Sequence, residues 1–153
     1  MKEAARAAVR QLDNLCDITQ TPIPEAMHSN QQTRAIGLGI MGLSDVLEKL
    51  GYCYESKEAY DLVDQLTEFI SYHAIDQSAD LAKELGSYPT FAGSGWSKGI
   101  LPIDTVDKLS KDRGVKVKID QKTRLDWDGL RKKVKKGMRN ATLMAIAPTA
   151  NIG

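Results

Sequence analysis

Residues 139–150 read Arg139-Asn140-Ala141-Thr142-Leu143-Met144-Ala145-Ile146-Ala147-Pro148-Thr149-Ala150. Their apolar part, residues 142–147, predicts a buried strand, and the Pro-Thr pair predicts a turn directly after it. Backbone N–H groups are left unpaired at the carboxyl end of such a strand, and oriented N–H groups can hold a phosphate. The stretch therefore indicates α/β architecture with a candidate anion site at residues 148–150, and an ordinary structural turn is the alternative.

Helical patterns account for most of the remaining chain, so we expect a mainly α fold with a few short strands at its rim. Ser56 is a good N-cap and Gly86 a good stop for a long helix, whose apolar stripe is expected to form the core. Asp126 is expected to cap a helix that Gly137 closes. The predicted helices cover residues 2–17, 43–50, 56–86 and 127–136.

The length of 153 residues matches one ordinary domain, so we expect residues 1–153 to form a single domain. Residues 87–125 read as a loop-rich insertion within it. The first part of this insertion is rich in glycine, proline and serine. In its charged second part, residues 115–119 alternate like a short edge strand.

Composition and charge exclude several classes of function. The 21 basic residues nearly cancel the 20 acidic ones, so no overall charge attracts the chain to nucleic acid or to a membrane. The basic segment 131–136 reads as a solvated helix face, with an anion contact as the alternative. Without a long apolar run or a signal core, and with distant cysteines at Cys16 and Cys53, we expect a cytoplasmic protein.

Residues 37–42 match the glycine pattern of dinucleotide-binding loops. Their context does not fit, because the polar segment 28–34 precedes them where a buried strand is required. Asp61 and Asp64 lie inside a predicted helix instead of ending a second strand. We therefore interpret these glycines as allowing two segments to pack closely, with Gly42 leading into the helix at 43–50.

Four blocks of sequence, in order and spacing, resemble the large, catalytic subunit of ribonucleotide reductase. The resemblance implies that the chain is a piece of this enzyme, from the ten-stranded α/β barrel that reduces ribonucleotides to deoxyribonucleotides for DNA replication. The variable parts between the blocks fall where we predict loops. The blocks are Arg34–Leu43, Asp80–Gly86, Lys98–Thr105 and Arg139–Ala150.

The resemblance also implies a substrate site at the final turn. Carried onto this sequence, Pro148 shapes the turn, Thr149 donates its hydroxyl and amide, and Ala150 donates its amide to substrate phosphates. In the family, further small hydroxyl residues lead into a helix that completes the phosphate site. Here Asn151 stands where serine or threonine is usual, so the cradle looks half built.

We assign no catalytic or metal-binding residue to this chain. The stretch Asn14–Ile18 resembles the loop of the radical cysteine, but its carboxylate comes one residue too early. Cys16 continues a helical stripe, so we interpret it as a small core residue. His28 reads as a polar-loop residue and His73 as a satisfied structural histidine, neither of them a convincing general base. No cluster of His, Cys, Asp and Glu has metal-ligand spacing.

The resemblance implies that other polypeptides supply the radical chemistry. The radical loop, the paired redox cysteines, the allosteric nucleotide domain and the radical-relay tyrosines have no matching positions here, so we expect this chain alone to be inactive. Its implied partners are the remainder of the large subunit, a small radical-generating subunit and a ribonucleoside diphosphate. The stretch Lys98–Asp104 favours a di-metal partner subunit over cobalamin as radical generator, and this chain itself holds no cofactor.

Two classes of function stay open. The first is a part of a ribonucleoside-diphosphate reductase that contributes barrel packing and a share of the diphosphate site. The second is a non-catalytic protein-interaction module that keeps the helices and binds only protein. Under either, strands without their barrel neighbours have unpaired edges, so we expect self-association through residues 142–147.

Overall fold

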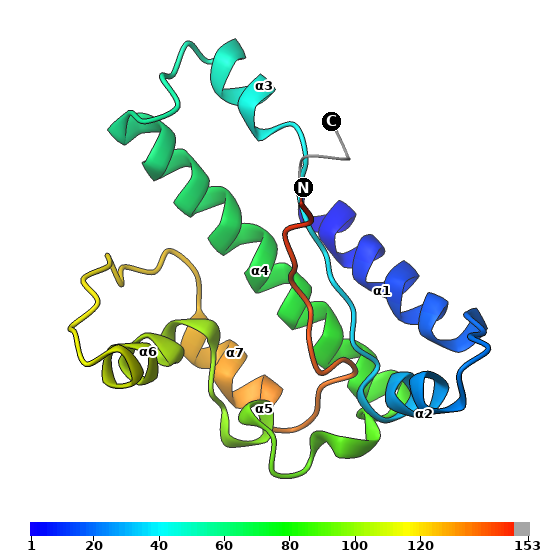
Figure 1. The fold of residues 1–153 in the computed structure, drawn as a ribbon. Coiled ribbons are helices and arrows are strands. Elements are labelled where there is room, and N and C mark those ends of the chain that lie inside the picture. The colour runs from blue at the N-terminus through cyan, green and yellow to red at the C-terminus, as the bar shows by residue number, and fades with distance from the viewer. Residues whose placement is uncertain (149–153) are drawn as a thin grey trace.

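The computed structural model describes residues 1–148, and this part of the chain is mainly helical, as predicted (Figure 1). The long helix α4 (Lys57–Leu85) packs against α1 (Lys2–Ile18) and against α7 (Trp127–Val134). None of the helices described is both long and apolar enough to cross a membrane. The other helices are α2 (Pro24–Thr33), α3 (Leu43–Lys49), α5 (Gly95–Lys98), α6 (Thr105–Arg113), and the 3-10 helices η1 (Pro89–Phe91) and η2 (Pro102–Asp104).

The predicted caps are confirmed at both ends of α4 and at the start of α7. Ser56 Oγ accepts a hydrogen bond from the Ala59 N–H at 3.1 Å, which satisfies one of the free donors at the start of α4. Helix α4 ends at Gly86, whose φ of 87° favours glycine. The Asp126 carboxylate accepts from the Gly129 N–H at 2.8 Å at the start of α7. Local side-chain chemistry therefore sets these three helix boundaries.

The core lies between α1, the second half of α4 and α7. The first half of α4 extends beyond the start of α1 (Figure 1), and most of residues 57–66 are exposed. The expectation that the whole 56–86 helix forms the core is therefore wrong for its first half. The buried apolar cluster consists of Val9, Ile36, Ala74, Ile75, Ala79, Leu81, Tyr88, Leu101, Leu130, Val134, Met138 and Leu143.

Ion pairs connect the same three helices. Arg6 of α1 contacts Asp76 and Asp80 of α4, with its Nη2 atom 2.9 Å from Asp80 Oδ2. Lys133 of α7 contacts the same two carboxylates, with Nζ 2.8 Å from Asp80 Oδ1. All four side chains are partly shielded from water, where charges interact more strongly than at a free surface. The alternating charges fix how the three helices lie against one another.

The strand predictions are largely wrong within residues 1–148. Residues 115–119 form no strand, and of the predicted strand 142–147 the structure shows only a parallel bridge between Leu38 and Met144. A strand is defined by the partners on its edges, and the described residues supply a single short partner for this segment. An apolar run with β propensity therefore stays extended without becoming part of a sheet.

The structure also contains helices that the sequence pattern does not predict. Helix α2 includes His28, which we expected in a polar loop, and α6 lies inside the expected loop-rich insertion 87–125 together with α5. Neither α2 nor α6 has a fully buried residue. Because they bury no apolar stripe, their sequences lack the period that reveals a helix.

Candidate functional site

Two extended segments, 35–40 and 141–148, lie side by side and run in the same direction (Figure 1). The Leu38 N–H donates to the Leu143 carbonyl at 2.7 Å, and the Ala145 N–H donates to the Leu38 carbonyl at 3.0 Å. The Ile36 N–H donates to the Thr142 carbonyl at 3.3 Å. The predicted phosphate turn, residues 148–150, begins at the last residue of the second segment of this parallel pair.

Glycines allow the two segments to approach closely. A Cβ atom at Gly37 would lie 2.8 Å from the Cβ of Ala145, and one at Gly39 would lie 2.5 Å from the Ala145 carbonyl oxygen. Both distances are too short for real side chains, so only glycine fits without displacement. Gly42, with a φ of 76°, precedes helix α3. The interpretation of this glycine motif as a close-packing device is confirmed.

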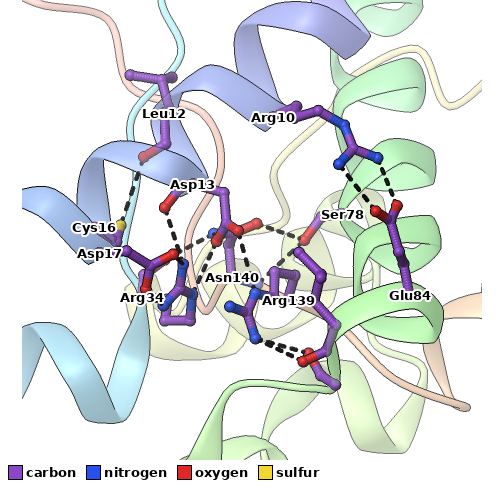
Figure 2. A network of polar contacts seen from close by, with 12 residues as sticks. Arg10, Leu12, Asp13, Cys16, Asp17, Arg34, Ser78, Glu84, Arg139 and Asn140 are labelled. Carbon is purple, nitrogen blue, oxygen red and sulfur yellow. Dashed lines mark hydrogen bonds and ion pairs between the residues drawn. The ribbon is translucent and has the colours of Figure 1, made fainter.

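Asn140, at the start of the second segment, is fully buried and joins three other parts of the chain (Figure 2). Its Nδ2 group donates to Asp13 Oδ1 at 2.9 Å and to the Arg34 carbonyl at 3.1 Å. Its Oδ1 accepts from Ser78 Oγ at 2.9 Å, and its backbone N–H donates to the same hydroxyl at 3.2 Å. Every polar group of the Asn140 side chain is therefore paired inside the core.

Arg34, directly before the first segment, is the most buried arginine of this network. Its guanidinium donates to Asp13 Oδ1 at 2.9 Å and to both oxygens of Asp17, at 2.6 and 2.9 Å. The bond to Asp17 is the main cause that raises the pKa of Arg34, and the same bond lowers the pKa of Asp17. Arg34 has a φ of 45°, the one positive φ among non-glycine residues in the range 1–148. The ion pairs of Arg34 with the buried Asp13 and the more exposed Asp17 hold the backbone in this uncommon conformation.

Arg139 ties the network to the end of α4. Its Nε donates to Asp13 Oδ2 at 3.2 Å, and its Nη1 donates to the carbonyls of Leu85 and Gly86 at 3.1 and 3.2 Å. A cation at a helix C-terminus satisfies carbonyls that lack an intrahelical partner. Asp13, whose side chain is 1% exposed, thus receives hydrogen bonds from Arg34, Arg139 and Asn140.

Of the predicted phosphate-binding residues, the structure describes only Pro148. Pro148 is exposed at the end of the second segment. Thr149 and Ala150 lie outside the described residues. The polar network of Asp13, Arg34, Ser78 and Asn140 was missed by the sequence reasoning, because Asp13 and Asn140 are 127 positions apart and no local pattern connects them.

Cys16 and His73 can be compared directly with their predictions. Cys16 is half-buried against the core, and its Sγ donates to the Leu12 carbonyl at 3.6 Å, as expected for a small core residue. Burial raises the pKa of the Cys16 thiol. His73 is buried on α4, but its Nδ1 has no hydrogen-bond partner in the described part of the chain. The prediction that His73 is structural fits its burial, whereas the prediction that it is satisfied is wrong.

No metal centre is built from residues 1–148, where no group of three or more His, Cys, Asp or Glu side chains could hold a metal ion. Cys16 and Cys53 are both free thiols in this part of the chain.

Comparison with known proteins identifies the family of this chain. The family model described as "Ribonucleotide reductase, barrel domain" matches residues 1–153. The chain belongs to this family. Ribonucleoside-diphosphate reductase subunit alpha of Chlamydia pneumoniae is 46% identical over 154 residues, which cover 99% of this chain and 15% of the relative. The Helicobacter pylori subunit alpha is also 46% identical, over 157 residues. The large subunit of Variola virus is 37% identical over 152 residues.

The match covers only part of these reductase subunits. The chain spans 15% of the length of the Chlamydia relative, 19% of the Helicobacter relative and 18% of the Variola relative. The two parallel segments and the buried Asn140 network both lie within the matched barrel-domain region. The geometry of this site thus belongs to one segment of the reductase barrel domain.

Proposed function

We propose that this chain contributes to the catalytic barrel of a ribonucleoside-diphosphate reductase large subunit, which converts ribonucleotides to deoxyribonucleotides in the cytoplasm. Its residues 1–153 would act as one partial barrel domain, with 87–125 as an insertion. The chain would supply barrel packing and part of the substrate diphosphate site, and it would be inactive alone. The family match over residues 1–153 is the observation that carries this proposal.

The open edges of the parallel pair support a place inside a larger barrel. The N–H groups of Ala35, Gly37 and Gly39 face away from the second segment and donate to no acceptor within residues 1–148. The same holds for Met144 and Ile146 of the second segment. Parallel strands are normally buried in sheets with neighbours on both sides. Strands from the remainder of the subunit would satisfy these groups.

The proposed phosphate contacts come directly after the end of the second segment of this ribbon, the parallel pair formed by residues 35–40 and 141–148. Thr149 would donate its hydroxyl and amide, and Ala150 its amide, to the phosphates of a ribonucleoside diphosphate, with Pro148 shaping the turn. Oriented N–H and O–H donors bind an oxyanion without a lysine, because charge-assisted hydrogen bonds are strong in a shielded site. Radical chemistry would begin in a separate di-metal subunit, which no residue described here replaces.

A chimeric reductase tests the proposal. This chain replaces the corresponding segment of the Helicobacter pylori large subunit, and reduction of a ribonucleoside diphosphate is measured with that organism's radical-generating subunit. We expect turnover, and a Thr149→Val variant should raise the KM of the diphosphate about tenfold while Thr149→Ser stays near the parent. A folded chimera without turnover would refute the proposed function.

The alternative is a non-catalytic interaction module. Exposed apolar side chains gather in the loops on both sides of α3, including Met41 at 73% exposure before it and Tyr54 at 64% between α3 and α4. Such a surface suits a protein partner under either function. The chimera separates the two, because only a part of the enzyme restores turnover.

A further inference from the structure

We propose that Asn140 is a positioning residue, which fixes the segment 141–148 lengthwise against 35–40 and thereby sets the place of Pro148, after which the proposed phosphate contacts follow. This inference rests on the proposed function for its consequence at the substrate. The anchor itself consists of Asn140 with Asp13, Ser78 and the Arg34 carbonyl (Figure 2).

Asn140 connects the segment 141–148 to the frame formed by helices α1 and α4. Its partners belong to α1 through Asp13, to α4 through Ser78, and to the start of the first segment through Arg34. Helices α1 and α4 are themselves held together by the core and by ion pairs. A shift of Asn140 along its segment would break all of these hydrogen bonds at once and leave buried polar groups unpaired.

Hydrogen bonds hold the segment 141–148 at its beginning and middle but not at its end. Ala141 donates to the Thr33 carbonyl at 2.9 Å and accepts from Trp96 Nε1 at 2.9 Å. Pairing then continues to Ala145, which donates to Leu38 at 3.0 Å. Beyond Ala145, residues 146–148 are exposed and make no hydrogen bond inside the described range. The position of Pro148 is therefore set from the Asn140 end of the segment.

The register of the two paired segments decides which side chains face the core. Leu143 is 3% exposed, and a slip of one residue would turn its side chain out of the core. The ribbon alone resists such a slip weakly, because its glycines carry no side chains and it holds a single parallel bridge. The buried hydrogen bonds of Asn140 fix the position of segment 141–148 along segment 35–40, which this short ribbon does not fix strongly by itself.

Removal of the Ser78 hydroxyl is the cleanest test. Ser78→Ala deletes both hydrogen bonds between Ser78 and Asn140 with little change of volume, and Asn140→Asp replaces the donor that faces Asp13 by a like-charged oxygen. Ser71→Ala is the matched control, since Ser71 is a half-buried serine on the same helix. All three are made in the 153-residue chain and in the chimeric reductase.

Amide exchange in the 153-residue chain measures the anchor directly. In Ser78→Ala we expect the Leu38 and Ala145 amides to exchange about tenfold faster than in the parent, with Ile75 of the core little changed. Equal acceleration of all three amides would indicate general destabilisation and would overturn the proposal. Unchanged exchange at Leu38 and Ala145 would overturn it too. The exchange rates of the same two amides in Asn140→Asp test the anchor independently.

Steady-state kinetics of the chimera measure the consequence at the substrate. A shift of Pro148 would displace the proposed phosphate contacts and weaken substrate binding. In the Ser78→Ala and Asn140→Asp chimeras we therefore expect the KM of the diphosphate to rise about tenfold, with kcat within about twofold of the parent. A merely structural role would lower the active fraction, and thus the apparent kcat, at constant KM; that result overturns the proposal. A parent chimera without any turnover refutes the proposed function and with it the substrate consequence, while the exchange result still decides whether Asn140 anchors the segment.

Discussion

Gly39 lies where any side chain would displace the backbone of the neighbouring segment. A Cβ at this position would lie 2.5 Å from the Ala145 carbonyl oxygen, and this oxygen cannot move like the end of a flexible side chain. We expect Gly39→Ala to lower the free energy of unfolding by about 1–3 kcal/mol, as overpacking does in tight sites. Urea denaturation followed by circular dichroism measures the change.

Gly95→Ala is the matched control for this prediction. A Cβ at Gly95 would lie 3.8 Å from the nearest atom, a Cβ of Ile100, which is ordinary contact. This variant should stay within about 0.5 kcal/mol of the parent. Equal stability of the Gly39→Ala and Gly95→Ala chains would show that the site at Gly39 accommodates a methyl group, which contradicts the prediction.

His73 predicts a pH dependence of stability. Burial lowers its pKa below the ordinary value, and the charges of Lys2 and Arg6 lower it further against the opposing effect of Asp76 and Glu3. The folded chain therefore protonates His73 less readily than the unfolded chain, whose His73 takes up a proton as pH falls through about 6.5. The stabilisation is present above that pH and is lost as pH falls toward the lowered folded pKa.

The pH dependence can be isolated with His73→Phe, which keeps an aromatic ring beside Phe69 and Tyr72. We expect the parent to lose stability as pH falls from about 7.5 through the unfolded-state pKa of about 6.5 and below, and the variant to lose less. Thermal unfolding across this range measures both, with His28→Gln of the exposed helix α2 as control. Parallel pH profiles for the parent and His73→Phe would contradict the assignment.

At the level of single residues, the sequence was informative where chemistry is local. Ser56, Gly86 and Asp126 act on backbone groups within a few positions, so their capping roles could be predicted. The packing role of the glycines at 37–42 could be inferred as well, because the alternative function failed on its flanking sequence. The pairing of Asp13 with Asn140 joins the two ends of the described chain, and only the fold reveals it.

Among the elements, α4 should behave as two parts of different stability. Residues 73–82 are mostly buried between α1 and α7, whereas residues 57–66 are mostly exposed. Local opening costs less where few apolar contacts are broken. We expect amides 61–66 to exchange at least about tenfold faster than amides 74–81, measured by hydrogen exchange and mass spectrometry.

Ser56→Ala sharpens this element-scale prediction. Loss of the Ser56 cap should cost about 1 kcal/mol of helix stability, and it should accelerate exchange in residues 61–66 with little effect on 74–81. Ser110→Ala, in the separate helix α6, is the control. Uniform exchange along α4, or an effect of Ser56→Ala that reaches the buried half, would show that the helix opens as one unit.

Apart from α3, which the sequence predicts at residues 43–50 after Gly42, the helices that could be predicted are those that bury an apolar stripe or carry a cap. Helices α1, α4 and α7 do so, and each was expected within a few residues of its observed bounds. Helices α2 and α6 bury no residue fully, so their patterns carry no helical period. The extended run 142–147 was recognised, but whether it joins a sheet depends on neighbours that no single segment encodes.

For the whole molecule, open backbone edges and exposed apolar side chains point to association. The ribbon of residues 35–40 and 141–148 leaves N–H groups without partners in the described range on both edges, and Ile146 is 66% exposed beside one of them. Unprotected edges of this kind recruit further strands from other chains. When the rest of the barrel is absent, a second copy of this chain is the partner that can pair with these open edges.

We therefore expect the isolated chain to self-associate reversibly through residues 142–147, seen as a concentration-dependent mass in sedimentation equilibrium. Ile146→Lys should shift the population to monomer, because a charge on a strand edge opposes pairing. Ile119→Lys is the matched control, since Ile119 is 48% exposed and lies outside the ribbon. A monomer at all concentrations, with the Met144 and Ile146 amides protected from exchange, would mean that the edge is already covered within the chain. The same edge should be protected in the chimeric reductase, where neighbouring strands of the barrel would take the place of the second copy.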